Sequence, residues 1–142
     1  MNTIANVRSR LRFDSVDHVR TPDGSGRVSV RLEWGGQMYE GTVPCLETQQ
    51  SVLKAASQAA LRATLASRSG NGDGIDLEVV GVKAVRAFDG WVVVARVNGS
   101  HGEERLRLLG AAPCEGEDDL PSAAVKAVLN ASNRVLEQRI AR

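Results

Sequence analysis

The sequence predicts an α+β fold built from two βββα units, with two helices packed on antiparallel strands. Two alanine-rich helical segments, residues 50–68 and 120–142, each follow a series of strand-like segments. Short clusters of Gly, Pro, Asn and Asp separate the strands, as they do in hairpins. The two units also share landmarks: Cys45 and Cys114 lie 69 positions apart and both follow a proline. The chain therefore reads as one unit present twice.

The strands of the first unit are predicted from the alternation of their side chains and from the turns between them. Residues 27–34 alternate apolar with polar or charged side chains, which is the period of a half-buried strand. Residues 11–19 and 37–43 are expected to be its neighbours, and the glycine pair before residue 37 suits a two-residue turn. Pro44 is expected to end the third strand, because it has no amide to donate.

The first helix, residues 50–68, is predicted to bury a stripe of small side chains that includes Ala56. Alanine has a high helix propensity, and its small side chain lets a helix approach a sheet closely. Thr48 precedes this helix and is expected to cap it, because its hydroxyl can accept a hydrogen bond from an amide of the first turn.

The second unit is predicted to repeat this order from residue 75 onward. Turn signals at Asp89-Gly90 and Asn98-Gly99 separate its strands, and Pro113 is expected to end the last of them. Its helix, residues 120–142, carries an apolar stripe on which Val128 lies.

Fixed offsets relate the two units. The offset of 69 also pairs Gly41 with Gly110, and an offset of 63 pairs Val28 with Trp91. An offset of 72 aligns the helices. A unit of about 60 residues covers its own sheet poorly, so the two units are expected to share one core.

The expected organisation is therefore a single domain over residues 1–142. It comprises a basic arm (1–10), the first unit (11–68), a linker (69–74) and the second unit (75–142).

Composition limits the classes of function. The formal net charge of +1 and an aromatic content of 4% argue against a nucleic-acid partner. No apolar run approaches the roughly 18–20 residues of a membrane span, so no membrane partner is expected. Two cysteines without an export signal predict the reducing cytoplasm.

Two segments resemble a known family. IDLEVVGVKAV (residues 75–85) and SAAVKAVLNASNR (residues 122–134) are similar to the C-terminal regulatory, or dimerisation, domain of 2-isopropylmalate synthases. The resemblance runs through residues 41–65 and 75–134. That domain is a βββα duplication that dimerises and binds leucine near the dimer interface, so the resemblance implies a homodimer and a small-molecule effector. The catalytic barrel has no counterpart here, and synthase activity is not implied.

The loops that join the last strand to the helix in each unit are the expected ligand site. The amides at the start of a helix lack partners within it and can receive an acceptor group. The expected ligand-binding residues are Cys45, Glu47, Thr48, Cys114, Glu117 and Asp119.

Other candidate sites have plainer interpretations. Cys45 and Cys114 precede helix starts, where a thiolate can be stabilised, but both also suit a strand end as small buried side chains. His18 and His101 have no cysteine or carboxylate at ligand spacing along the chain, so no metal site is expected. The acidic run over residues 115–119 is expected to be solvated rather than to bind calcium. No cofactor is expected.

The leading hypothesis is a non-enzymatic, standalone regulatory-domain-like protein, a homodimer that binds a small effector or a protein partner. Two alternatives stay open. One is a nucleic-acid-binding module with a basic strand face that includes Arg12 and Arg20; the other is a cysteine-dependent enzyme that uses Cys45 or Cys114. Near-neutral charge argues against the first, and the absence of a histidine in the same motif argues against the second.

Overall fold

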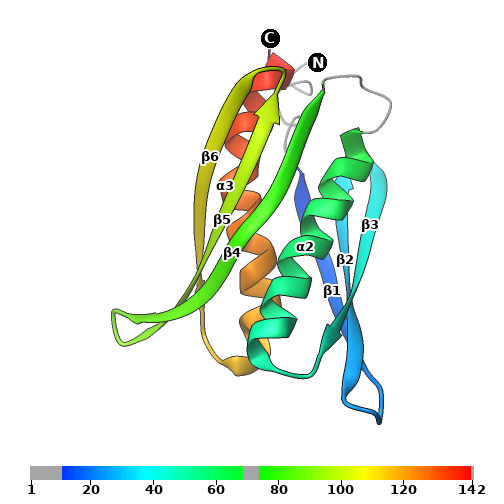
Figure 1. Cartoon of the computed structure of the whole chain (residues 1–142), viewed down its shortest axis with the longest axis vertical. Coiled ribbons are helices and arrows are strands. Elements are labelled where there is room, and N and C mark those ends of the chain that lie inside the picture. Colours follow the sequence, from blue (N-terminus) through cyan, green and yellow to red (C-terminus); the bar gives the residue numbers. More distant parts are fainter. Residues whose placement is uncertain (1–10, 69–73, 142) are drawn as a thin grey trace.

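The computed structural model describes residues 11–68 and 74–141, with side chains described for all of these except residues 117 and 134–141. The predicted basic arm and nearly all of the predicted linker lie outside the described residues. Each unit contributes one three-stranded antiparallel sheet and one long helix (Figure 1). The predicted α+β fold with two βββα units is confirmed.

The elements follow one another in the predicted order. In the first unit they are β1 (Arg12–Arg20), β2 (Ser25–Trp34), β3 (Gln37–Leu46) and α2 (Gln49–Arg68). In the second unit they are β4 (Ile75–Ala87), β5 (Gly90–His101), β6 (Glu104–Cys114), the short 3-10 helix η1 (Glu117–Asp119) and α3 (Leu120–Ala141). Both long helices begin at the same end of the molecule and run in the same direction (Figure 1).

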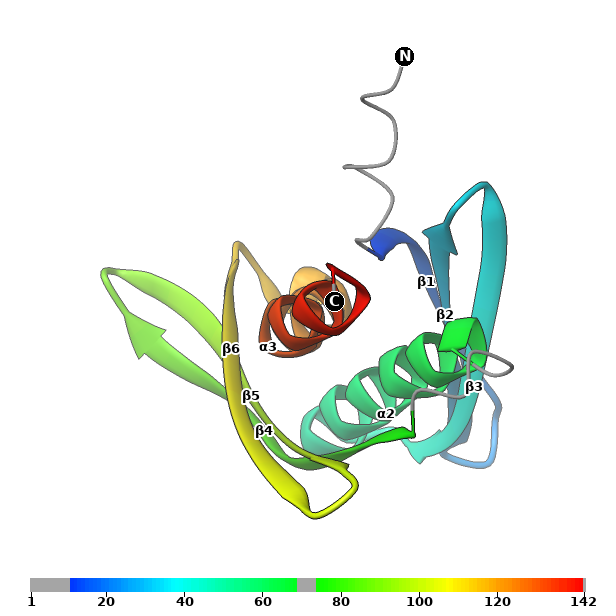
Figure 2. The ribbon, with the colours of Figure 1, turned by 90° about the horizontal axis from the view of Figure 1, so that it is seen from above.

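The two helices form a layer between the two sheets, as Figure 2 shows. α2 packs against β2 and β3 of its own sheet, α3 packs against β5 and β6, and the helices pack against each other. Contacts also cross between the units, because α2 touches β4 and α3 touches β1. Each unit therefore needs the other to complete its core.

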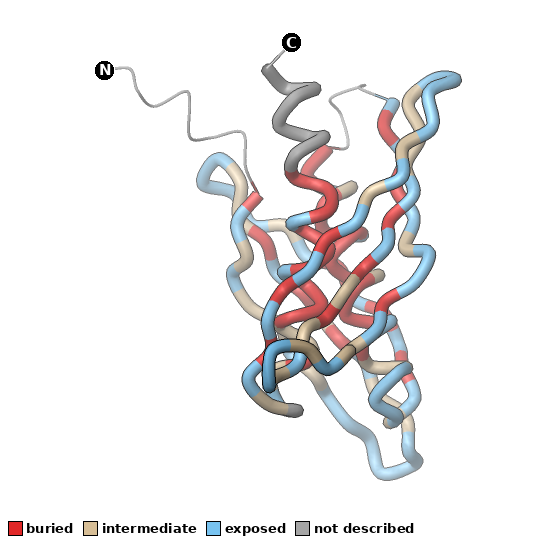
Figure 3. Tube along the Cα trace, turned by 90° about the vertical axis from the view of Figure 1, so that its left-hand side faces the viewer, coloured by how far each residue is buried: buried red, intermediate tan, exposed pale blue. Residues whose placement is uncertain are grey.

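The buried residues gather along the helices and the sheet faces that meet them (Figure 3). Ala56 and Val128, which were predicted to face the core, are fully buried. The buried hydroxyls of Ser57, Thr64 and Ser132 each donate to the carbonyl oxygen four residues back, so these polar groups are not left unpaired. Neither helix in the described part of the chain combines the length and apolarity that a membrane crossing requires.

A glycine in the third strand of each unit lets the helix touch that strand backbone to backbone. A Cβ added to Gly41 would clash with the carbonyl oxygen of Ala59, and a Cβ added to Gly110 would clash with that of Ala127. The predicted pairing of these two glycines is confirmed. In both units the glycine is required because the helix backbone lies directly against the strand.

The glycine contacts also define which positions of the two units are structurally equivalent. Val30 pairs with Gly41 and Ala95 pairs with Gly110, so β2 and β5 align at an offset of 65 rather than the predicted 63. Ala59 contacts Gly41 and Ala127 contacts Gly110, so the helices align at an offset of 68 rather than the predicted 72. Each predicted offset is wrong by one structural period, which is two residues in a strand and about four in a helix. Such a slip leaves the buried face unchanged.

Two predicted strand ends are also wrong. Pro44 and Pro113 lie inside β3 and β6, which continue to Leu46 and Cys114. Both strands are edges of their sheets, where a residue without an amide donor is tolerated.

The turns of the two units were predicted unequally well. Gly35-Gly36 has positive φ at both residues, as a primed two-residue turn requires. Asn98-Gly99, predicted as a turn, lies inside β5, and the chain turns instead at Gly102, which has a φ of 64°. The turn predicted at Asp89-Gly90 begins one residue earlier, at Phe88.

Candidate functional site

The loops that precede α2 and α3 lie close together and line one hollow. This hollow has a volume of about 180 Å³ and lies at the end of the molecule where both helices begin. We call it the inter-unit hollow. Its lining residues are His18, Arg20, Glu47, Thr48, Gln49 and Val52 from the first unit and Asp118, Leu120 and Pro121 from the second.

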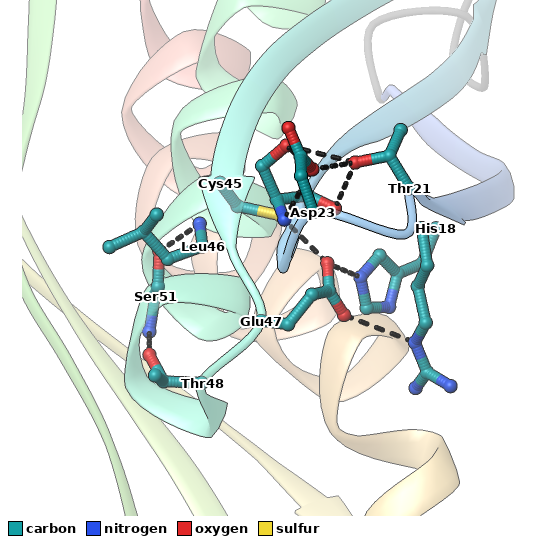
Figure 4. A network of polar contacts seen from close by, with 10 residues as sticks. His18, Thr21, Asp23, Cys45, Leu46, Glu47, Thr48 and Ser51 are labelled. Carbon is teal, nitrogen blue, oxygen red and sulfur yellow. Dashed lines mark hydrogen bonds and ion pairs between the residues drawn. The ribbon is translucent and has the colours of Figure 1, made fainter.

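Glu47 is the centre of a polar network at one side of this hollow (Figure 4). One carboxylate oxygen, Oε2, lies 2.9 Å from Nε2 of His18 and accepts a hydrogen bond from Sγ of Cys45 at 3.7 Å. The other oxygen, Oε1, pairs with Nε of Arg20 at 3.1 Å. The hydrogen bond with His18 lowers the pKa of Glu47; partial burial opposes this, and the charges of His18 and Arg20 add to it. Glu47 is therefore a carboxylate at neutral pH.

Strand register explains why these side chains meet. Arg20 on β1, Gly26 on β2 and Cys45 on β3 pair in one row across the sheet. His18 lies two rows away, opposite the fully buried Val28, so its ring is on the inner face of the sheet. A Cβ on Gly26 would clash with the carbonyl oxygen of Val19 and would lie 2.5 Å from Oε2 of Glu47, so the glycine leaves space both for the neighbouring strand and for the carboxylate.

The hydroxyl groups of Thr48 and Ser51 form hydrogen bonds with backbone amides at the start of α2. The Ser51 amide donates to Oγ1 of Thr48 at 3.2 Å, which confirms the predicted cap. Oγ of Ser51 in turn accepts a hydrogen bond from the Leu46 amide at 2.9 Å. These bonds fix the loop that carries Glu47 against the helix.

The predicted ligand-binding residues of the second unit lie apart from the Glu47 network. Cys114 is buried and borders a separate small cavity of about 20 Å³, and its Sγ donates to the carbonyl oxygen of Gly116 at 3.0 Å. The Asp119 amide donates to the same carbonyl group at 3.0 Å, and Asp118 rather than Asp119 lines the inter-unit hollow. The side chain of Glu117 lies outside the described residues.

Both thiols are in surroundings that favour the protonated form. Burial raises the pKa of Cys45, and the charge and hydrogen bond of Glu47 raise it further. Burial also raises the pKa of Cys114, and the charges of Asp119 and Glu115 add to this, although the hydrogen bond to Gly116 acts in the opposite direction. The interpretation of both cysteines as small buried side chains fits this geometry better than an activated thiolate does.

His18 has no cysteine or carboxylate at ligand spacing along the chain, but the fold brings one of each close to it. Donor atoms of His18, Cys45 and Glu47 all lie within 4.8 Å of one another. Spacing along the chain missed this cluster because strand pairing, not sequence proximity, brings the histidine to the other two residues. One sequence signal was available: a histidine occupies an inward position in the alternation of the first strand, two residues after Val16.

The outer faces of the two sheets differ in chemistry. On the first sheet the face directed away from the helices carries Asp17, Arg27, Ser29, Arg31 and Glu40. Its charges are of both signs, and Arg20, which the nucleic-acid alternative placed on a basic strand face, pairs with Glu47 instead. On the second sheet the corresponding face carries an apolar group, Val85, Val92, Val94, Leu109 and Ala111, beside the charged side chains of Lys83 and Arg96.

No protein-family model matches this chain, and no significant match was found among curated proteins. The function of the inter-unit hollow therefore has to be argued from its own geometry.

Proposed function

We propose that the chain is a non-enzymatic, regulatory-domain-like protein that binds a small ligand in the inter-unit hollow. The observation that carries this proposal is that residues of both units line the same hollow. A molecule bound there contacts both halves of the core at once, so its binding free energy favours one relative placement of the two units. The sequence resemblance to a regulatory domain supports the same class of function.

The lining residues indicate the chemistry of the ligand. Arg20 offers a cation, Glu47 and Asp118 offer carboxylates, and Val52 and Leu120 offer apolar surface. Opposite charges around a small apolar patch suit a zwitterion of amino-acid size. The volume of about 180 Å³ is below the roughly 300–1,000 Å³ of pockets for drug-sized ligands, which also favours a small molecule.

A thermal-shift panel of amino acids and small carboxylic acids tests this proposal. A ligand that binds the folded chain at a concentration 100 times its Kd stabilises it by about 2.7 kcal/mol, which raises the melting temperature measurably. We expect at least one zwitterion to raise it, and Arg20→Ala to abolish the shift. The matched control is Arg27→Ala, which removes the same charge from the outer face of the same sheet and should leave the shift intact. A panel without any shift would refute the proposal.

We also propose that the protein is a homodimer joined through the outer face of the second sheet, which we call the β4–β6 outer face. The equivalent face of the first sheet shows that the fold itself does not require apolar residues here: Val92 and Val94 stand where the first unit has Arg27 and Ser29. Leu109, which is 70% exposed, stands where the first unit has Glu40. Pairing with a second copy would remove this apolar surface from water.

The proposed cellular location is the cytoplasm. Both cysteines are free and buried in the fold, which suits a compartment that keeps thiols reduced.

A further inference from the structure

We infer that His18, Cys45 and Glu47 form a binding site for a zinc-like divalent cation, with Nε2, Sγ and Oε2 as the ligand atoms. All three atoms lie within 4.8 Å of one another. His18 is on β1, Cys45 is on β3, and Glu47 is in the loop between β3 and α2. Figure 4 shows the three side chains converging. This inference goes beyond the binding of a small organic ligand and does not depend on it.

The distances between the donor atoms suit a tetrahedral ion. Zinc binds nitrogen and oxygen at about 2.0–2.2 Å and sulfur at about 2.3 Å, which puts neighbouring ligand atoms about 3.3–3.6 Å apart. Oε2 of Glu47 lies 2.9 Å from Nε2 of His18 and 3.7 Å from Sγ of Cys45. The cation would take the place of the proton between these groups. The two distances from Oε2 are within about half an ångström of the tetrahedral spacing, and Nε2 of His18 and Sγ of Cys45 lie within 4.8 Å of each other.

The second unit provides an internal comparison. The row Arg20–Gly26–Cys45 of the first sheet corresponds to the row Arg86–Trp91–Cys114 of the second. In the second unit the arginine lies over the tryptophan ring at 5.2 Å, and Gly116 stands at the position of Glu47.

The next row whose side chains face the helices differs in the same way. Ala84 lies opposite Val93 in the second unit, where His18 lies opposite Val28 in the first. The same strand–helix junction is thus built in the second unit with one donor side chain, a cysteine, instead of three. The second unit forms this junction without counterparts of His18 and Glu47, so the presence of these two side chains beside Cys45 points to a separate role.

Arg20 acts as a positioning residue for this site. Its Nε holds Oε1 of Glu47 at 3.1 Å and leaves Oε2 directed toward His18 and Cys45. Partners of this kind orient the ligands of metal sites and raise their affinity. The charges balance: a dication with one thiolate and one carboxylate is neutral, and the thiol proton that the cation displaces leaves to solvent.

The choice of cation follows from the donor atoms. Thiolate and imidazole ligands favour zinc over calcium and magnesium, which prefer oxygen. Three protein ligands leave one position of the tetrahedron open. His18 and Glu47 both line the inter-unit hollow, so a water molecule or another donor can reach the open position from there.

Cobalt(II) is the probe for this site, because cobalt bound by a thiolate shows a near-ultraviolet charge-transfer band that an oxygen and nitrogen site lacks. We expect the reduced, untagged full chain to develop this band with one equivalent of cobalt and to lose it when zinc is added. Cys45→Ser should abolish the band and weaken cobalt binding by more than about 100-fold. The matched control is Cys114→Ser at the equivalent buried position. This variant should keep the charge-transfer band and bind cobalt as tightly as the wild type.

His18→Ala provides a second variant, because the second unit folds with Ala84 at that position. We expect circular dichroism to show an intact fold and cobalt binding to weaken by at least about tenfold. This variant decides the question if Cys45→Ser does not fold. The inference is wrong if the wild-type chain shows no band, if the band follows Cys114 instead of Cys45, or if His18→Ala binds cobalt as tightly as the wild type. None of these results depends on the thermal-shift panel, so the two proposals can fail separately.

Discussion

Gly41 and Gly110 illustrate how a single missing carbon atom sets the distance between a helix and a strand. At each position the space that a Cβ would take is filled by the backbone of the facing helix, and at Gly110 such a Cβ would lie 2.5 Å from the Ala131 amide nitrogen. Backbone atoms cannot rotate away as a side chain can. The whole helix would have to move to accept a larger residue.

Gly110→Ala is therefore expected to destabilise the protein by about 1–3 kcal/mol, the usual cost of overpacking. Urea unfolding followed by circular dichroism measures this loss. Gly81→Ala is the matched control: Gly81 also lies in a strand of the second sheet, but an added Cβ would have no neighbour within 4 Å. Its effect should stay within about 0.5 kcal/mol. Equal losses for the two variants would contradict this account of the close approach.

At the scale of the elements, the turn between β1 and β2 is held by one carboxylate. Asp23 accepts hydrogen bonds from the Ser25 hydroxyl, the Thr21 hydroxyl and the Ser25 amide. These bonds lower the pKa of Asp23 from 3.8 to about 2, and the hydrogen bond from the Ser25 hydroxyl contributes most to the shift. The charged form is therefore favoured in the folded state.

This shift predicts how acid affects the stability of the turn. Because the folded-state pKa is lower than the unfolded one, the stabilising contribution of Asp23 is fully present at pH values well above 3.8 and is lost as the pH falls through 3.8 toward about 2. The difference in unfolding free energy between the wild type and Asp23→Asn should stay constant from neutral pH to about 5 and then shrink. Urea unfolding at several pH values measures this difference, and taking the difference cancels the other carboxyl groups. If the difference in unfolding free energy between the two proteins grew as the pH fell, the lowered pKa of Asp23 would be contradicted.

The elements also show which features a sequence can predict. Alternation placed Val28 and Val30 on the buried face correctly, because a strand repeats every two residues. The same periodicity could not distinguish an offset of 63 from one of 65, since both put the same face inward. The sequence predicts strand ends at Pro44 and Pro113 because nothing in it marks β3 and β6 as sheet edges, where proline is tolerated.

At the scale of the whole molecule, the sequence predicts only part of the lining of the inter-unit hollow. The sequence placed it at the loops before the helices, and Glu47 and Thr48 do line the inter-unit hollow. Arg20 and His18 were missed because their approach to Glu47 depends on the pairing of β1 with β2 and β3, which no local pattern reports. Cys114 was grouped with Cys45 by position, although the two have different neighbours.

The proposed dimer leads to a prediction at this scale. Leu109→Glu puts a charge among the apolar side chains of the β4–β6 outer face, so it should weaken dimerisation at least about tenfold, or 1.4 kcal/mol. Analytical ultracentrifugation over a range of concentrations measures the change. Glu40→Arg alters the charge at the equivalent position of the first sheet and should leave association unchanged. A wild-type chain that stays monomeric at high concentration would refute the dimer.

The parallel course of α2 and α3 has an electrostatic consequence. Each helix carries roughly half a positive charge at its first turn, and here the two fields add at one end of the molecule instead of cancelling, as they would in an antiparallel pair. The carboxylates of Glu47 and Asp118 lie at that end. They offset the mutual repulsion of the two helix starts, so neutralising both would loosen the helix pair even where no ligand is bound.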